Sequence, residues 1–203
     1  MYRKTKWANN LGKSIRSIAV LLICSAVTAS LPGCGGDRAP QVTHGGTQVT
    51  INELQSRNST IESDTNKKSD WVELYNGSET DEDLAGFFIS DDAASPKKAM
   101  LASLAVVPAN GFLVLWLDDT MVSGTPLHFP FKLSGDGDHF LLSDPKGNVI
   151  RKVALPADPT GTDTTVPDVS YGAYPDGSTT YSWCSTPTPG APNAADCAVD
   201  AGI

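Results

Sequence analysis

The side chains that could do chemistry in this chain are acids, histidines and cysteines, and the acids are the most tightly grouped. Two carboxylate pairs, Asp91-Asp92 and Asp118-Asp119, each follow a segment that we expect to be a strand. Ca²⁺ takes about six to eight oxygen ligands, and neighbouring carboxylates can supply them. These four residues are therefore the candidates for a weak calcium site. Solvated loop acids that bind nothing are the favoured alternative.

The histidines are His44, His128 and His139, and His44 precedes the expected domain. We expect a hairpin turn near residues 135–136, which would place His139 roughly opposite Lys132. His128 would then lie about 13 Å away, at a rise of about 3.3 Å per residue. One metal ion with bonds of about 2 Å cannot bind both rings. No GxSxG or HExxH motif is present, so the sequence predicts neither a zinc site nor an enzyme.

The first 33 residues have the layout of an export signal. They contain five basic residues and no acidic one, and an apolar run covers 18–29. That run is about a dozen residues long, whereas a spanning helix needs about 20. The alternatives are an ordinary secretory signal or a poorly hydrophobic membrane anchor.

The segment Leu31-Pro32-Gly33-Cys34 resembles the lipobox of bacterial lipoproteins. The resemblance implies that residues 1–33 are removed, and that 34–46 comprise the lipidated Cys34 followed by a flexible tether of 12 residues, 35–46. Two or more acyl chains would give lasting attachment to a membrane. Gly35, in place of Asp, favours the outer membrane or the cell surface of a bacterial envelope.

Charge is distributed unevenly along the chain. The residues after 33 retain ten Lys or Arg against 23 Asp or Glu, a net charge of about −13. Nucleic-acid affinity comes largely from Lys and Arg that displace counterions. We therefore expect no nucleic-acid partner.

Cys184 and Cys197 remain as an even pair in an exported chain, which implies a disulfide. Closing a loop of this length should stabilise the fold by about 3 kcal/mol on the chain-entropy model. A pair of free thiols is the alternative. A metal-binding pair is disfavoured because the spacing is not CxxC and no histidine lies nearby.

Short apolar or alternating segments separated by Gly, Pro, Asn and Asp predict an all-β sandwich or barrel. In 70–75 the alternation places Val72 and Leu74 on one face and Glu73 on the other, at the rim of the sandwich. A helix is a weak alternative only around 96–107. The expected strands are 48–54, 70–75, 86–90, 100–107, 111–117, 127–133, 139–143, 149–154, 169–174 and 180–184.

The order of these segments resembles the bacterial form of the lamin tail domain, an immunoglobulin-like β-sandwich. The resemblance rests on ordered pieces that include 70–76 (DWVELYN), 83–91 (DLAGFFISD), 168–177 (DVSYGAYPDG) and 186–193 (TPTPGAPN). It covers 47–193. The proline-rich piece 186–193 cannot continue a central ladder, so we expect an extended strap fastened by the Cys184–Cys197 bridge. Residues 194–203 go beyond the family pattern.

These features together predict a non-catalytic, membrane-anchored lipoprotein whose domain is a binding or structural module. The resemblance implies a partner that is a protein or another component of the envelope or the extracellular space. No cofactor is expected, apart from the calcium considered above. The alternatives are a calcium-dependent binder of an envelope polymer and an unrecognised hydrolase.

Overall fold

The computed structural model describes residues 46–119, 126–161 and 168–198. Its regular elements are strands, with a single turn of 3-10 helix, η1 (Ala195–Ala198), near the end of the described chain. Within those three ranges, no helix is long and apolar enough to cross a membrane. The nearly all-β structure confirms the fold class predicted from the alternating segments.

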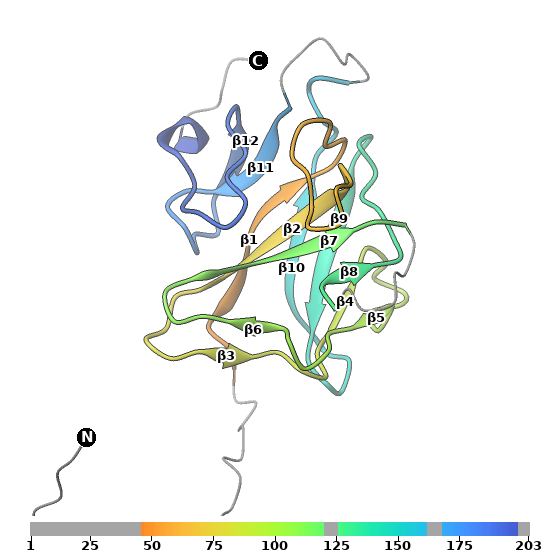
Figure 1. Cartoon of the computed structure of the whole chain (residues 1–203). Coiled ribbons are helices and arrows are strands. Elements are labelled where there is room, and N and C mark those ends of the chain that lie inside the picture. The colour runs from red at the N-terminus through yellow and green to blue at the C-terminus, as the bar shows by residue number, and fades with distance from the viewer. Residues whose placement is uncertain (1–45, 120–125, 162–167, 199–203) are drawn as a thin grey trace, which may run out of the picture. The chain divides into compact units, whose positions relative to one another are not determined.

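The strands form two main sheets and a small ribbon (Figure 1). All neighbouring strands are antiparallel except β7 and β8, which are parallel. The six-stranded sheet has the order β12 (Tyr181–Cys184), β11 (Ser170–Ala173), β1 (Val49–Gln55), β2 (Asp70–Asn76), β7 (Phe112–Leu117), β8 (His128–Phe129). The four-stranded sheet has the order β10 (Val149–Leu155), β9 (Asp138–Ser143), β4 (Phe88–Ser90), β5 (Ala99–Met100), and the ribbon pairs β3 (Glu82–Asp83) with β6 (Val106–Val107).

The core consists of alternate residues from the two main sheets. Val72 and Leu74 of β2 are completely buried in it, as the alternation in 70–75 predicted. Burial of such side chains is the main stabilising contribution to a sandwich of this size. Other fully buried members are Ile51, Leu54, Leu115 and Leu117 from the six-stranded sheet and Ile89, Phe140 and Leu142 from the four-stranded sheet.

An irregularity in β1 changes which side chains reach the core. The register pairs Ile51 with Leu74 and then Glu53 with Glu73, so Asn52 is the extra residue of a β-bulge. A bulge resets the alternation, which lets Ile51 and Leu54 both face the core although they are three positions apart. It also places Glu53 and Glu73 opposite each other on the outer face of the sheet.

Two expected elements differ from the structure. The expected strand 100–107 is two short strands, β5 and β6, in different sheets, with a turn closed by Ala105 N–H to Ala102 O. The expected hairpin with its turn near residues 135–136 is wrong, because β8 lies in the six-stranded sheet and β9 in the four-stranded one. Pro130 has no N–H to continue the ladder, and β8 ends at Phe129. His139 therefore does not pair with Lys132.

Candidate functional site

The most unusual side chains of the described chain are two buried glutamates on the outer face of β1 and β2. The segment 186–193, which we call the C-terminal strap, covers this face. Thr188 N–H donates to Glu53 Oε1 at 3.2 Å, and Gly190 N–H donates to Glu73 Oε2 at 2.6 Å. The strap is not fully extended, because Ala191 N–H bonds to Thr188 O in a turn and Gly190 has a φ of +82°. The prolines of the strap restrict its backbone. The carboxylates of the two glutamates accept hydrogen bonds from the N–H groups of residues that lie between these prolines.

Glu53 and Glu73, which we call the glutamate pair, have no exposed area. Glu73 was expected at the rim of the sandwich, but the strap covers it and its side chain is buried. Glu53 also accepts hydrogen bonds from the hydroxyls of Ser170 and Thr188, and Glu73 accepts one from Asn52 Nδ2 at 3.0 Å. Every carboxylate oxygen of the pair therefore has a donor.

Burial determines the protonation of the glutamate pair. It raises the pKa of Glu53 to about 7, against the lowering effect of hydrogen bonds from Ser170 and Thr188. It raises the pKa of Glu73 to about 8, against hydrogen bonds from Asn52 and Gly190, and the charge of Glu53 adds to the rise. Like charges opposite each other on adjacent strands destabilise a sheet. The pair therefore holds a proton around neutral pH and titrates as a unit.

Two asparagines extend the network from the glutamate pair to the turn after β11. Asn52 Nδ2 also donates to Asp176 Oδ1 at 3.0 Å, and Asn52 Oδ1 accepts from Gly177 N–H at 3.0 Å. Asn193, at the end of the strap, donates through Nδ2 to Ala173 O at 2.7 Å. Its backbone N–H donates to Asp176 Oδ1 at 3.0 Å. A fully satisfied buried network of this kind fixes one arrangement of the segments that it joins.

Gly172 of β11 lies directly beneath this network. A Cβ at this position would lie 2.8 Å from Cys184 Sγ and 2.9 Å from Asn193 Nδ2. Both atoms belong to well-packed groups, so a larger residue would force the strap away from the sheet.

A disulfide joins Cys184 to Cys197, the pairing that the sequence suggested, with the Cα atoms 4.3 Å apart. It links the end of β12 to η1, so it closes the chain on both sides of the strap. Ser185 Oγ donates to Asp196 Oδ2 at 2.6 Å across the same junction. The strap is thus held covalently at its ends and by hydrogen bonds along its length.

The four predicted calcium ligands do not converge. Asp91 binds Lys98 Nζ at 2.6 and 2.7 Å, and Asp92 accepts from Ala94 N–H at 2.8 Å in a turn. Asp118 is buried against a histidine, and Asp119 lies 3.9 Å from Lys132 Nζ. In the part of the chain that the structure describes, no three His, Cys, Asp or Glu side chains are grouped to hold a metal ion. Asp91, Asp118 and Asp119 instead contact neighbouring basic side chains, and Asp92 accepts a backbone N–H.

His128 makes an arrangement that the sequence did not reveal. Its Nδ1 lies 2.5 Å from Asp118 Oδ2, and its Nε2 lies 2.5 Å from Asp64 Oδ1. Both nitrogens can donate only when the ring is protonated. The side chain of Asp64 is 71% exposed and belongs to the loop between β1 and β2, so His128 ties this loop to β8. Because a carboxylate contacts each ring nitrogen, His128 joins two segments of the domain and does not stand as a base beside a nucleophile.

The remaining predicted residues lie outside the described ranges. These are Cys34, the predicted lipid attachment site, and His44. No sequence signal pointed to the glutamate pair, because its burial depends on the bulge at Asn52 and on a strap that is distant in sequence.

The fold agrees with a comparison to known families. The model of the Lamin Tail Domain matches residues 43–156, more than half of the chain, and the chain belongs to this family. The family is an immunoglobulin-like binding or structural domain and not a family of enzymes. No curated protein matches the chain. Strands β11 and β12 come after the matched residues in the chain. They belong to the six-stranded sheet, in which β11 lies beside β1.

Proposed function

We propose that this protein is a lipid-anchored, non-catalytic module of a bacterial cell envelope, located at the outer membrane or the cell surface. Its lamin tail domain would bind or support another envelope or extracellular component. The observation that carries the proposal is the lipobox-like Leu31–Cys34, placed 15 positions before Val49, the first residue of β1. At the dimensions of a flexible chain, the 12 residues 35–46 would span about 20 Å, so the domain would work close to the membrane.

The burial of the glutamate pair and of His128 supports a non-catalytic role. The glutamate pair has no exposed area, and a general acid or base must come within hydrogen-bond reach of its substrate. The ring of His128 is also buried, with carboxylates at both nitrogens. These groups are used to hold segments of the domain together.

The anchor is tested by incorporation of a labelled fatty acid into the full-length protein in a bacterial host. Cys34→Ala should abolish the label, whereas Cys24→Ala, in the segment expected to be removed, should keep it. The mature wild-type protein should begin at Cys34 by mass spectrometry. Labelling that survives Cys34→Ala would refute the anchor.

The binding role is tested by capture from an envelope extract with the mature lipoprotein in detergent. A specific partner should be retained by the native protein. A control that is reduced and alkylated at Cys184 and Cys197 should lose it if the strap region forms the binding surface. Retention of nothing above the background of an unrelated lipoprotein would count against a binding role and leave a structural one.

A further inference from the structure

The most exposed hydrophobic side chains of the described ranges lie near one end of the domain. In the described ranges, five large hydrophobic residues are exposed, and the largest exposures are Leu104 at 63%, Met100 at 60% and Val149 at 45%. Met100 pairs with Phe88, Phe88 with Ser143, and Ser143 with Val149. These residues therefore form one cross-strand row at an end of the four-stranded sheet. Exposed apolar groups that cluster in this way mark an interaction surface more often than scattered ones do.

The start of β1 lies at the same end of the sandwich (Figure 1). Arg151, two positions after Val149, donates through Nη2 to the carbonyl of Thr47 at 2.7 Å, just before β1. Val49 pairs with Asn76, and Asn76 Nδ2 donates to Val107 O in β6 at 3.1 Å. The segment that carries Leu104 therefore also ends beside the start of β1.

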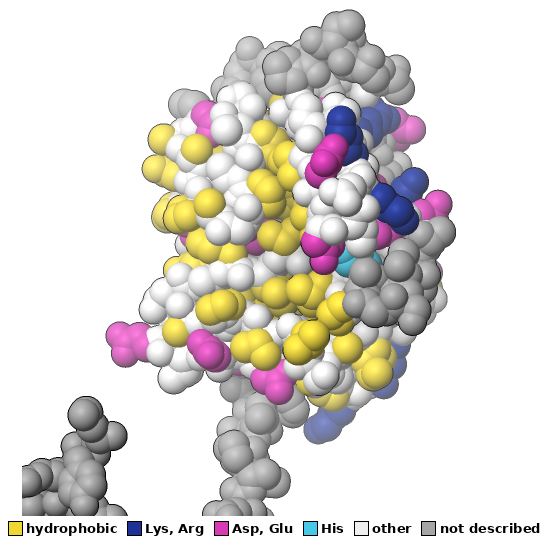
Figure 2. All heavy atoms as spheres, in the orientation of Figure 1, with side chains coloured by type: hydrophobic (Ala, Val, Ile, Leu, Met, Phe, Trp, Pro, Cys, Tyr) yellow, Lys and Arg dark blue, Asp and Glu magenta, His cyan; other side chains and the backbone are white. Residues whose placement is uncertain are grey.

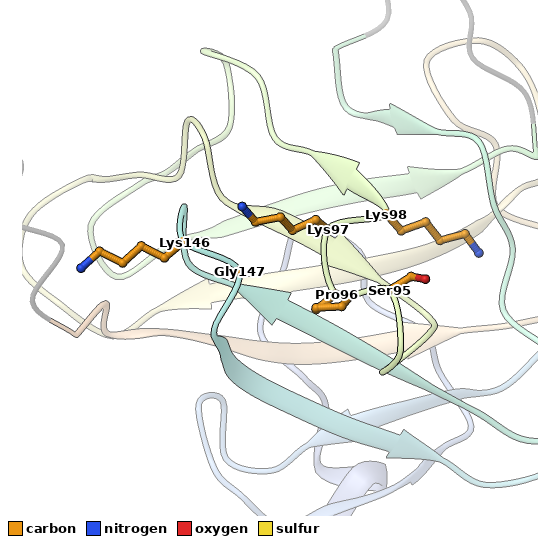
Figure 3. A pocket seen from close by; sticks show the side chains of 6 residues that line it. All are labelled: Ser95, Pro96, Lys97, Lys98, Lys146 and Gly147. Atoms are coloured by element: carbon orange, nitrogen blue, oxygen red, sulfur yellow. The ribbon is translucent and has the colours of Figure 1, made fainter.

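Two lysines lie beside the apolar row. Lys97 Nζ stands 4.9 Å over the ring of Phe88, and Lys97 and Lys146 line a shallow hollow of about 420 Å³. Figure 3 shows these two side chains extending in the same direction, whereas Lys98 points the opposite way, where it binds Asp91. The hairpin that carries Lys146 packs closely on Lys97, because a Cβ on Gly147 would lie 2.6 Å from Lys97 Cε.

Charge is segregated at this end of an otherwise acidic domain. In Figure 2, Asp and Glu side chains lie toward the lower left and Lys or Arg side chains toward the lower right. The acids Glu82 and Asp83 belong to β3, on the side of the ribbon. A negatively charged surface would therefore be repelled by the ribbon side and attracted to the side of Lys97 and Lys146.

We propose that Met100, Leu104, Val149, Lys97 and Lys146 form a face that rests on an anionic lipid surface, with the lysines at lipid phosphates and the apolar side chains among the headgroups. The proposal rests on the lipid anchor proposed above and adds an orientation to it. The proposed anchor would hold the end of the domain that contains the start of β1 nearest to the bilayer. Apolar side chains combined with basic ones are the usual means of attachment in the interfacial plane.

The test uses the full-length lipoprotein reconstituted in vesicles of phosphatidylcholine, with or without phosphatidylglycerol. An environment-sensitive dye is placed at Leu104→Cys or, as a control, at Ala157→Cys, an exposed position just after β10 at the opposite end of that strand. Quenching by bromine-labelled lipid should be at least about twofold stronger at Leu104→Cys in the anionic vesicles. Lys97→Gln combined with Lys146→Gln should remove most of that difference. The matched control is Lys67→Gln with Lys68→Gln, in the loop between β1 and β2, and it should not change the quenching.

Flotation of the vesicles separates this proposal from the anchor. Protein that fails to float with the vesicles refutes the anchor and, with it, the orientation. Protein that floats but shows equal quenching at Leu104→Cys and Ala157→Cys refutes the orientation alone. Equal quenching in vesicles with and without phosphatidylglycerol, or no effect of the Lys97 and Lys146 substitutions, overturns the assignment to anionic lipid.

Discussion

Replacing Glu73 by Gln should change how the stability of the domain depends on pH. Glu73 has a pKa of about 8 in the folded protein and about 4.5 in the unfolded chain. The folded state therefore binds a proton that the unfolded state has released in this range. Stability linked to this proton is fully present below about pH 4.5 and is lost as the pH rises through about 8.

The size of the effect follows from the displacement of the pKa. Each unit corresponds to about 1.4 kcal/mol, so Glu73 alone could account for up to about 5 kcal/mol. Loss of Glu73 also relieves the repulsion that Glu53 experiences, so part of this energy is shared within the glutamate pair. We expect Glu73→Gln to gain roughly 2 to 4 kcal/mol relative to the wild type between pH 5 and pH 8.5.

Urea unfolding at half-unit pH steps measures this difference directly. The wild type should lose stability steeply between about pH 5 and pH 8, with contributions from Glu53 and from Asp70, whose pKa burial raises to about 6. The Glu73→Gln profile should be flatter, whereas Glu79→Gln, at an exposed position, should follow the wild type. Parallel profiles for the wild type and Glu73→Gln would refute the argument that the buried carboxyl keeps its proton.

Three further outcomes follow from the packing of the strap and the arrangement of the acids. Removal of the disulfide by Cys184→Ala with Cys197→Ala should lower the free energy of unfolding by about 3 kcal/mol in urea titrations. An unchanged midpoint of the urea unfolding curve would contradict the role of the disulfide in fastening the strap. Gly172→Ala should lower the free energy of unfolding by at least about 2 kcal/mol, because the new Cβ would meet Cys184 Sγ and Asn193 Nδ2. Gly77→Ala, whose new Cβ would have its nearest contact at 3.4 Å, should leave the free energy of unfolding nearly unchanged. Calcium at millimolar concentration should leave the thermal midpoint unchanged, and a midpoint that rises with calcium concentration would reveal a site that the described residues do not show.

The sequence predicts the framework of the domain well, because strand patterns are local. The alternation in 70–75 is enough to place Val72 and Leu74 in the core, and the even pair Cys184 and Cys197 is enough to suggest a bridge. Both inferences depend only on residue types, spacing and the expected compartment. They need no knowledge of which strands are neighbours.

The glutamate pair could not be predicted in the same way, because it depends on two non-local features. The bulge at Asn52 brings Glu53 opposite Glu73, and no residue type in β1 marks a bulge by itself. The covering strap then comes from more than 100 positions farther along the chain. The separation of the four candidate calcium ligands could not be predicted for a related reason. The fold places Lys98 beside Asp91 and His128 beside Asp118.

The pairing of β1 with β11 also limits where the chain can be cut. Glu53 pairs with Gly172, so one edge of β1 stays without a partner until this late segment has been synthesised. A fragment that stops at residue 156, where the family match ends, would expose that edge and both glutamates. Open edges of this kind promote aggregation between chains. Soluble expression of the domain should therefore require residues through Cys197, and folding should be completed only after the last part of the chain is available.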